Sequence, residues 1–129
     1  MKVKTHEKVN TRLVGRPISI KDDEEAVVEL KADWDMAVDE RGLIHGGFTF
    51  GLADYAAMLA VNHPNVVLGA SRVRFLAPVR SNDVMVARAL VVKREGKRRD
   101  VEVNVSVEEK EVLTGNMTCY ILSRHILEQ

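Results

Sequence analysis

The sequence predicts an α+β fold in which one long, buried central helix is wrapped by a curved antiparallel β-sheet of five to six strands. The helix is predicted at 46–60, where the residues are apolar around nearly the whole circumference. A helix with no polar face must be enclosed by other elements. After it the hydrophobic pattern changes to a period of two, which is typical of strands. A sheet that curves around the helix encloses it economically in a chain of 129 residues.

The other elements follow from local patterns. Residues 24–32 form a strand-like run, which a strand or short helix precedes and a polar loop at 39–42 follows. The helix is expected to end near Asn62, because the residue before a proline, here Pro64, disfavours helical backbone. Four further strands are predicted at 66–75, 84–92, 101–107 and 112–122. Their short connections indicate antiparallel hairpins, so we expect a four-stranded meander.

Composition excludes several classes of protein. A chain of 129 residues, 46% of them hydrophobic, makes one globular domain spanning residues 1–129. The formal net charge is zero, so no overall positive field attracts nucleic acid or an anionic membrane. No apolar segment of targeting or membrane-spanning length occurs, and we expect a cytoplasmic protein. The single cysteine, Cys119, excludes an intramolecular disulfide and is expected to pack as a small hydrophobic side chain.

One carboxylate stands out within the predicted helix. Asp54 is the only charged side chain between residues 46 and 60, and its neighbours are apolar. A carboxylate removed from water without partners is so unfavourable that it is neutralised or finds donors, which makes Asp54 a functional candidate. The alternative is a side chain that reaches the surface or bonds a backbone amide.

The start of the helix is a second candidate. At His45, Gly46 and Gly47, unpaired backbone N–H groups and the positive end of the helix dipole converge. Such a terminus binds an anion or stabilises the oxyanion that develops during acyl transfer. The two glycines have a simpler alternative explanation, which is a tight entry turn beside packed strands.

His45 and Asp54 cannot meet at one small reacting group within one chain. Nine residues of helix place them on opposite faces, about 13 Å apart along the axis. If both serve one site, a twofold dimer must bring the helix start of one protomer near Asp54 of the other.

Three short segments resemble the hotdog-fold thioesterases of the phenylacetyl-CoA (PaaI-like) type. They are Gly-Leu-Ile-His-Gly-Gly at 42–47, Leu-Ala-Asp at 52–54 and Phe-Leu-Ala-Pro at 75–78, within a resemblance that covers roughly 24–123. It implies a hotdog fold and hydrolysis of an acyl-CoA to free acid and CoA, with no cofactor. The resemblance also implies a homodimer with sites across its interface, and dimers that can pair into tetramers.

The resemblance also implies roles for individual residues. Asp54 would be the nucleophile or general base, and the amide of Gly46 would polarise the thioester carbonyl. His45 would support the carbonyl side of the site, or be a structural histidine bonded to backbone. Asp39 departs from the family, which often has an asparagine there that holds the attacking water. Asp39 would place a second carboxylate near Asp54, altering or abolishing activity, or would simply lie in a solvated loop.

Expected substrate-binding residues lie on the helix, on the strand after it and on the next turn: Gly47, Tyr55, Ser71, Arg72, Arg74 and Arg80. Ser71 would line the acyl pocket, and the arginines would bind the phosphates of CoA. Tyr55 stands where several relatives have a small hydroxyl residue, so help to the water is not expected from it. The basic cluster at 93–99 is interpreted as a solvated turn. The four histidines lack ligand spacing, so no metal is predicted.

Three functions remain open from the sequence. The leading interpretation is an acyl-CoA thioesterase, with an acyl-carrier-protein thioester as a less favoured substrate. The alternative is a non-catalytic acyl-CoA binding or sensing protein, which Asp39 favours. A hotdog dehydratase or hydratase is disfavoured, because the segment 45–47 does not match the loop of those enzymes.

Overall fold

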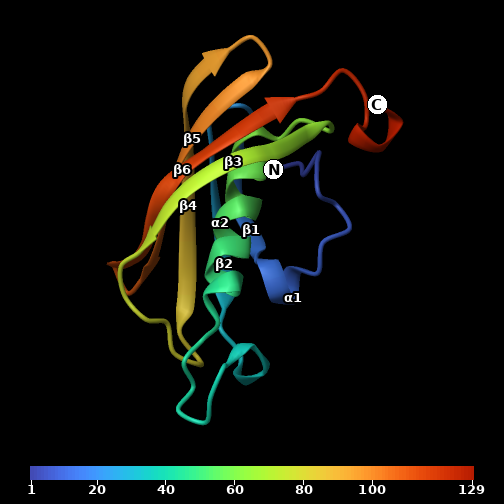
Figure 1. Cartoon of the computed structure of the whole chain (residues 1–129). Coiled ribbons are helices and arrows are strands. Elements are labelled where there is room, and N and C mark those ends of the chain that lie inside the picture. Colours follow the sequence, from blue (N-terminus) through green and yellow to red (C-terminus); the bar gives the residue numbers. More distant parts are fainter.

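A computed structural model describes residues 1–129 and confirms the predicted fold class, with one six-stranded antiparallel sheet wrapped around a single long helix (Figure 1). The elements in chain order are α1 (Thr11–Val14), β1 (Arg16–Lys21), β2 (Glu25–Lys31), η1 (Trp34–Met36), α2 (Gly46–Val61), β3 (Val66–Phe75), β4 (Val84–Glu95), β5 (Arg98–Val107), β6 (Lys110–Ile121) and η2 (Ile126–Glu128). All the predicted strands and the helix are present. Both a short helix and a strand precede the strand predicted at 24–32.

The order of the strands corrects one prediction. The order is β1-β2-β4-β5-β6-β3, so only β4, β5 and β6 form a meander, and β3 pairs with β6 instead of β4. The reason lies in the connection 76–83, whose backbone pairs with the loop before α2. Ile44 N–H donates to the Val79 carbonyl at 2.9 Å, and Ser81 N–H donates to the Gly42 carbonyl at 2.8 Å. The connection therefore crosses the start of α2, and β3 lies at the edge of the sheet.

The sheet buries almost all of α2. From Leu52 to Val61 every residue of the helix is buried except Asp54. These residues belong to a hydrophobic core of 28 side chains, which explains why a helix without a polar face is stable here. The less covered side of α2 runs along Gly47, Gly51 and Asp54. No helix of the chain is long and apolar enough to cross a bilayer.

The two faces of the sheet separate residues that are close in sequence. On β3, Ser71 pairs with buried Met117 and therefore faces the helix side, whereas Arg72 and Arg74 point to the outer face. Next to Arg72, strands β3 and β6 approach closely. A Cβ on Gly115 of β6 would lie 2.3 Å from the Arg72 carbonyl oxygen. A glycine is required at this contact.

The helix ends at Asn62 in a left-handed conformation, with φ of 51°, as the sequence predicts for this region. The side chain of Asn62 is buried and ties three segments together. Its oxygen accepts from Lys4 N–H at 2.9 Å, and its amide donates to the Lys2 carbonyl and to Asp22, each at 2.8 Å. The N-terminal segment is thereby fixed across the C-terminal end of α2, next to the C-terminal segment (Figure 1).

We predict that Asn62→Gly lowers the free energy of unfolding by about 1–3 kcal/mol, because partners of the side chain lose their hydrogen bonds while the backbone remains relaxed. Asn62→Ala loses a further 1–2 kcal/mol, roughly, because alanine tolerates the left-handed conformation poorly. Urea denaturation of the three proteins measures both steps. Equal stability of the glycine and alanine variants would contradict the backbone part of this account.

Candidate functional site

A pocket of about 450 Å³ lies between the first turn of α2 and the segment that leaves β3. Its walls are mostly apolar, and its lining residues are Ile44, Gly46, Thr49, Phe75, Leu76, Ala77, Pro78, Val79 and Val112. The ring of Phe75 lies so close to the helix start that a Cβ on Gly46 would be 3.4 Å from it. A concave, largely apolar pocket with a few polar groups is the usual form of a small-molecule site.

The N–H of Gly46 is a free backbone donor at the helix start. The N–H of Gly47 donates to Nδ1 of His45 at 2.7 Å, so this donor is occupied. The N–H of Gly46 has no acceptor within the chain, and Gly46 lines the pocket. At this position the positive end of the helix dipole adds to the donor. The arrangement can therefore bind a carbonyl oxygen or an anion.

His45 is the N-cap of α2, and this defines what its imidazole can do. Because Nδ1 accepts from Gly47, the proton of the neutral ring lies on Nε2, an assignment that follows from the hydrogen bond. The ring also packs edge-on against Phe48, with 6.2 Å between the ring centroids. Two roles were expected for His45. The hydrogen bond from Gly47 favours the structural role, in which the histidine is bonded to backbone.

Asp54 lies two turns further along α2 and does not line the pocket. Its Oδ1 is buried and has no hydrogen-bond partner, and burial raises the pKa of the carboxyl above its ordinary value. An unpartnered buried carboxylate oxygen is costly, which keeps Asp54 a candidate functional residue.

Cys119 is buried on the helix side of the sheet, as predicted. Burial, and then the charges of Asp54 and Asp100, raise the pKa of its thiol to about 12. The thiol is therefore protonated at neutral pH and is not a nucleophile.

Asp39 shapes the loop that precedes the helix. Its Oδ1 accepts from the N–H groups of Arg41 at 3.0 Å and Leu43 at 3.2 Å, while the side chain remains exposed. An asparagine side chain can accept the same two bonds through its oxygen. Only Oδ2, the atom that an asparagine would replace with an amide nitrogen, differs between the two residue types.

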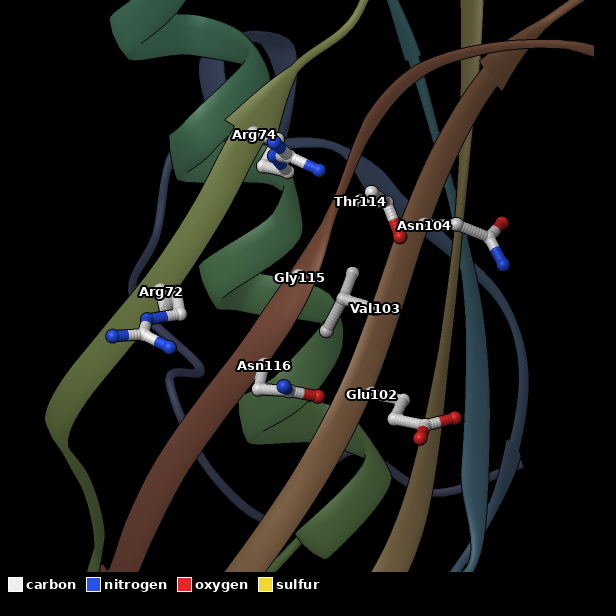
Figure 2. A pocket seen from close by; sticks show the side chains of 8 residues that line it. All are labelled: Arg72, Arg74, Glu102, Val103, Asn104, Thr114, Gly115 and Asn116. Carbon is white, nitrogen blue, oxygen red and sulfur yellow. The ribbon is translucent and has the colours of Figure 1, made fainter.

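Arg72 and Arg74 border a second depression, of about 750 Å³, on the outer face of the sheet (Figure 2). They form two cross-strand rows with β6 and β5, which are Arg72–Asn116–Glu102 and Arg74–Thr114–Asn104. Neither guanidinium takes part in an ion pair of the chain. Figure 2 shows α2 behind these strands. Within one chain, the two arginines therefore lie on the opposite face from Gly46.

The other expected substrate-binding residues are not gathered in one place. Ser71 is exposed on the helix side of β3, whereas Tyr55 is almost fully buried in the core, and burial raises the pKa of its hydroxyl. Arg80 is exposed on the connection that crosses the helix start. Its backbone forms an isolated antiparallel β-bridge with Leu43.

Six of the nine residues that line the pocket belong to the segments 42–47 and 75–78 of the resemblance, but Thr49, Val79 and Val112 were not predicted. These three residues lie on α2, on the connection after β3 and on β6, so no single segment of the sequence contains them.

The basic hairpin between β4 and β5 is paired with acids, which fits its interpretation as a solvated turn. Arg94 and Arg99 bond Asp23, and Arg98 bonds Asp100. No three His, Cys, Asp or Glu side chains are grouped so that they could hold a metal ion.

Solved structures resemble the chain over most of its length. The uncharacterized protein PH1136 from Pyrococcus horikoshii is 53% identical, with a TM-score of 0.96 over 98% of this chain and 97% of that one. An asparagine-to-aspartate mutant of the phenylacetic acid degradation protein PaaI from Thermus thermophilus is 29% identical. Its TM-score is 0.78, over 87% of this chain and 97% of that one.

Curated relatives are longer proteins. Methylthioribose-1-phosphate isomerase from Aquifex aeolicus is 44% identical over 115 residues, which are 89% of this chain but only 25% of that protein. Transcription factor FapR from Caldanaerobacter subterraneus is 25% identical over 128 residues, covering 99% of this chain and 63% of that protein. The chain thus spans a quarter of the first relative and less than two thirds of the second.

The family model of the thioesterase superfamily matches residues 41–114, more than half of the chain. This range includes the helix start, Asp54 and the pocket wall up to Val112. With the fold and the similarity to PaaI, the match shows that the chain belongs to the thioesterase superfamily, as a PaaI-like hotdog protein.

Proposed function

We propose that the protein is an acyl-CoA thioesterase, which hydrolyses the thioester to a free acid and CoA. The observation that carries this proposal is the free N–H of Gly46 at the positive end of α2, in the wall of an apolar pocket. Hydrolysis of a thioester develops negative charge on the carbonyl oxygen, and a donor fixed at that point stabilises it. The neighbouring N–H of Gly47 donates to Nδ1 of His45, and this N-cap bond fixes the first turn of the helix.

Asp54 is the second reacting group in this proposal. As a general base it takes a proton from water while the water oxygen attacks the carbonyl carbon; as a nucleophile it attacks directly, and water then hydrolyses the resulting anhydride. In both routes the C–S bond breaks and the sulfur leaves as CoA, which is protonated. The buried, unpartnered Oδ1 of Asp54 fits a group whose partner is the reacting water or carbonyl.

The proposed active form is a homodimer, because Gly46 and Asp54 are about 12 Å apart along the helix axis. Two features support a second copy. The open side of α2 carries Gly51, where an added Cβ would meet no atom within 4 Å, so another chain could approach closely. The edge strand β3 is exposed over most of its length, and unpaired edges invite pairing. Pairing of dimers into tetramers remains a further proposal.

The pocket favours an uncharged acyl group. None of its lining residues carries a charge, and transferring a carboxylate into such a wall without a partner is unfavourable. We assign the phosphates of CoA to Arg72, Arg74 and Arg80. Arg72 and Arg74 can contact these phosphates only if the bound CoA extends from the pocket over the edge of the sheet to its outer face.

The second candidate function is acyl-CoA sensing without hydrolysis. Two observations favour it, the presence of Asp39 and the similarity to transcription factor FapR, of which the chain matches 63%. Sensing needs the same pocket and the same donor but no attack by water. Thiol release separates the two functions.

We predict that Asp54→Asn lowers the rate of thiol release from acyl-CoA by about 10²–10⁴-fold, because the amide cannot accept the proton of water. Binding of CoA, measured by calorimetry, should remain. Spectrophotometric thiol detection with short, aryl and long acyl-CoAs gives the rates. Tight binding of acyl-CoA by the wild type without thiol release would refute hydrolysis and favour sensing.

The pH profile tests the same residue. Burial raises the pKa of Asp54 above its ordinary value of 3.8. Because the carboxylate is the active form, kcat/KM should be high above this raised pKa and fall as the pH drops through it. The acidic limb should therefore lie above pH 3.8. An identical limb in the residual activity of Asp54→Asn would assign it to another group.

We predict that the double variant Arg72→Ala and Arg74→Ala raises KM for acyl-CoA, because two charge-assisted hydrogen bonds to phosphate are lost. The rise in KM should be about 10²-fold or more, because each of the two charged bonds contributes roughly 1.5–3 kcal/mol. The same variant should leave KM unchanged for acyl N-acetylcysteamine thioesters, which lack the nucleotide. Arg88→Ala, which removes an unpaired arginine from β4, is the matched control. Equal effects on both substrates would refute the phosphate role.

We predict that Asp39→Asn keeps both stability and thiol release, because the amide oxygen accepts from Arg41 and Leu43 as the carboxylate does. Asp39→Ala should lose about 0.5–2 kcal/mol of stability, as when a comparable side-chain cap is removed. Thermal unfolding and thiol release measure the two effects. If only Asp39→Asn released thiol and the wild type did not, the chain would be a sensor.

A further inference from the structure

Thr49 lies one helical turn after Gly46, and its side chain lines the same pocket. The residue is only 3% exposed, and it is the sole hydroxyl in the pocket wall. Neither the resemblance nor the sequence pattern pointed to it.

The hydrogen bonding of Thr49 differs from that of the other buried polar residues. Three such residues occur, namely Thr5, Thr49 and Asn62. Thr5 bonds the ring of His6 at 2.8 Å, and Asn62 makes three bonds of 2.9 Å or less. The hydroxyl of Thr49 donates only to the sulfur of Met85, at 3.6 Å. Sulfur is a weak acceptor, so this hydroxyl is incompletely satisfied.

The hydroxyl of Thr49 also lacks the hydrogen-bond acceptor that threonines in helices commonly use. Helical threonines commonly donate to the carbonyl four residues earlier, which here belongs to His45. No such bond is present, and the His45 carbonyl accepts instead from Phe48 N–H at 3.1 Å. The hydroxyl is thus buried beside the pocket and free to change its weak acceptor for a better one.

We propose that Thr49 is a catalytic residue whose hydroxyl donates to the carbonyl oxygen of the bound acyl thioester, together with the N–H of Gly46. Residues three apart on a helix are neighbours on one face, about 5–6 Å apart, and both of these border one pocket. One oxygen between them receives both donors. The hydroxyl keeps its proton throughout, and its bond strengthens as negative charge develops on the oxygen. This inference rests on the proposed thioesterase function.

Three variants separate this role from a structural one. Thr49→Val keeps the shape and removes the hydroxyl, Thr49→Ser keeps the hydroxyl, and Met85→Leu removes the sulfur acceptor at nearly constant volume. Thr49→Val should lower kcat about 10²-fold with little change in KM, as loss of an oxyanion donor does. Thr49→Ser should retain most of kcat, and Met85→Leu should retain all of it. Equal losses in Thr49→Val and Met85→Leu, or no loss in Thr49→Val, would overturn the proposal.

A measurement without turnover keeps the inference distinct from the proposed reaction. The probe is an acyl-CoA analogue in which a methylene group replaces the thioester sulfur, so that the carbonyl is a ketone that cannot be hydrolysed. Its infrared carbonyl stretch should be at lower frequency when bound to the wild type and to Met85→Leu than when bound to Thr49→Val. Equal frequencies in all three proteins, or no binding to the wild type, would overturn the role of Thr49. If the wild type released no thiol but the frequency shift were present, hydrolysis would fail and the hydrogen bond from Thr49 would stand.

Discussion

The structure depends on one constraint, which is that α2 has no polar face and must be covered on every side. Six strands cover most of it, and the sheet has to curve to do so. The curvature places the connection 76–83 across the first turn of the helix, where its backbone pairs with residues 42–44. The pocket beside Gly46 results from this crossing, because its wall consists of the helix start, the crossing segment and the beginning of β6. The same chain segments therefore enclose the helix and form the candidate site.

The same enclosure makes the polar groups of the site unusual. Away from water a hydrogen bond is electrostatically stronger, and an unpaired polar group is more costly. The hydroxyl of Thr49 and Oδ1 of Asp54 are buried and short of good partners, in a molecule whose other buried polar residues are well satisfied, and the free N–H of Gly46 lies at the exposed start of the same helix. Two buried, poorly satisfied groups on one helix are hard to explain by packing alone. They are explained together if a ligand and a second chain supply what is missing.

The elements of the fold were predictable because their signals are local. An apolar run located α2, alternation located β2 to β6 within a few residues, and the proline after Asn62 located the helix end, whereas β1 was expected only as a strand or short helix before residue 24. The position of β3 was not predictable in the same way, because a connection of this length allows either a hairpin or a crossing. Alternation along β3 could have shown that Ser71 faces the helix while Arg72 and Arg74 face outward. No sequence signal could show that Thr49 has a poor acceptor, because its only partner, Met85, is 36 residues away.

Asp39 departs from the asparagine that the resemblance leads one to expect at this position, and its hydrogen bonds limit what the departure can change. The carboxylate shapes the loop through Oδ1, which an asparagine would also do, so the substitution is nearly neutral for the fold. The difference is confined to Oδ2. In the proposed dimer this atom adds negative charge near Asp54 of the partner subunit, and a like charge raises a carboxyl pKa that burial has already raised. In the proposed dimer, an aspartate here would move the acidic limb of the pH profile to higher pH. Thiol release above that limb, the pocket and its donors would be the same as with an asparagine, as the Asp39→Asn prediction requires.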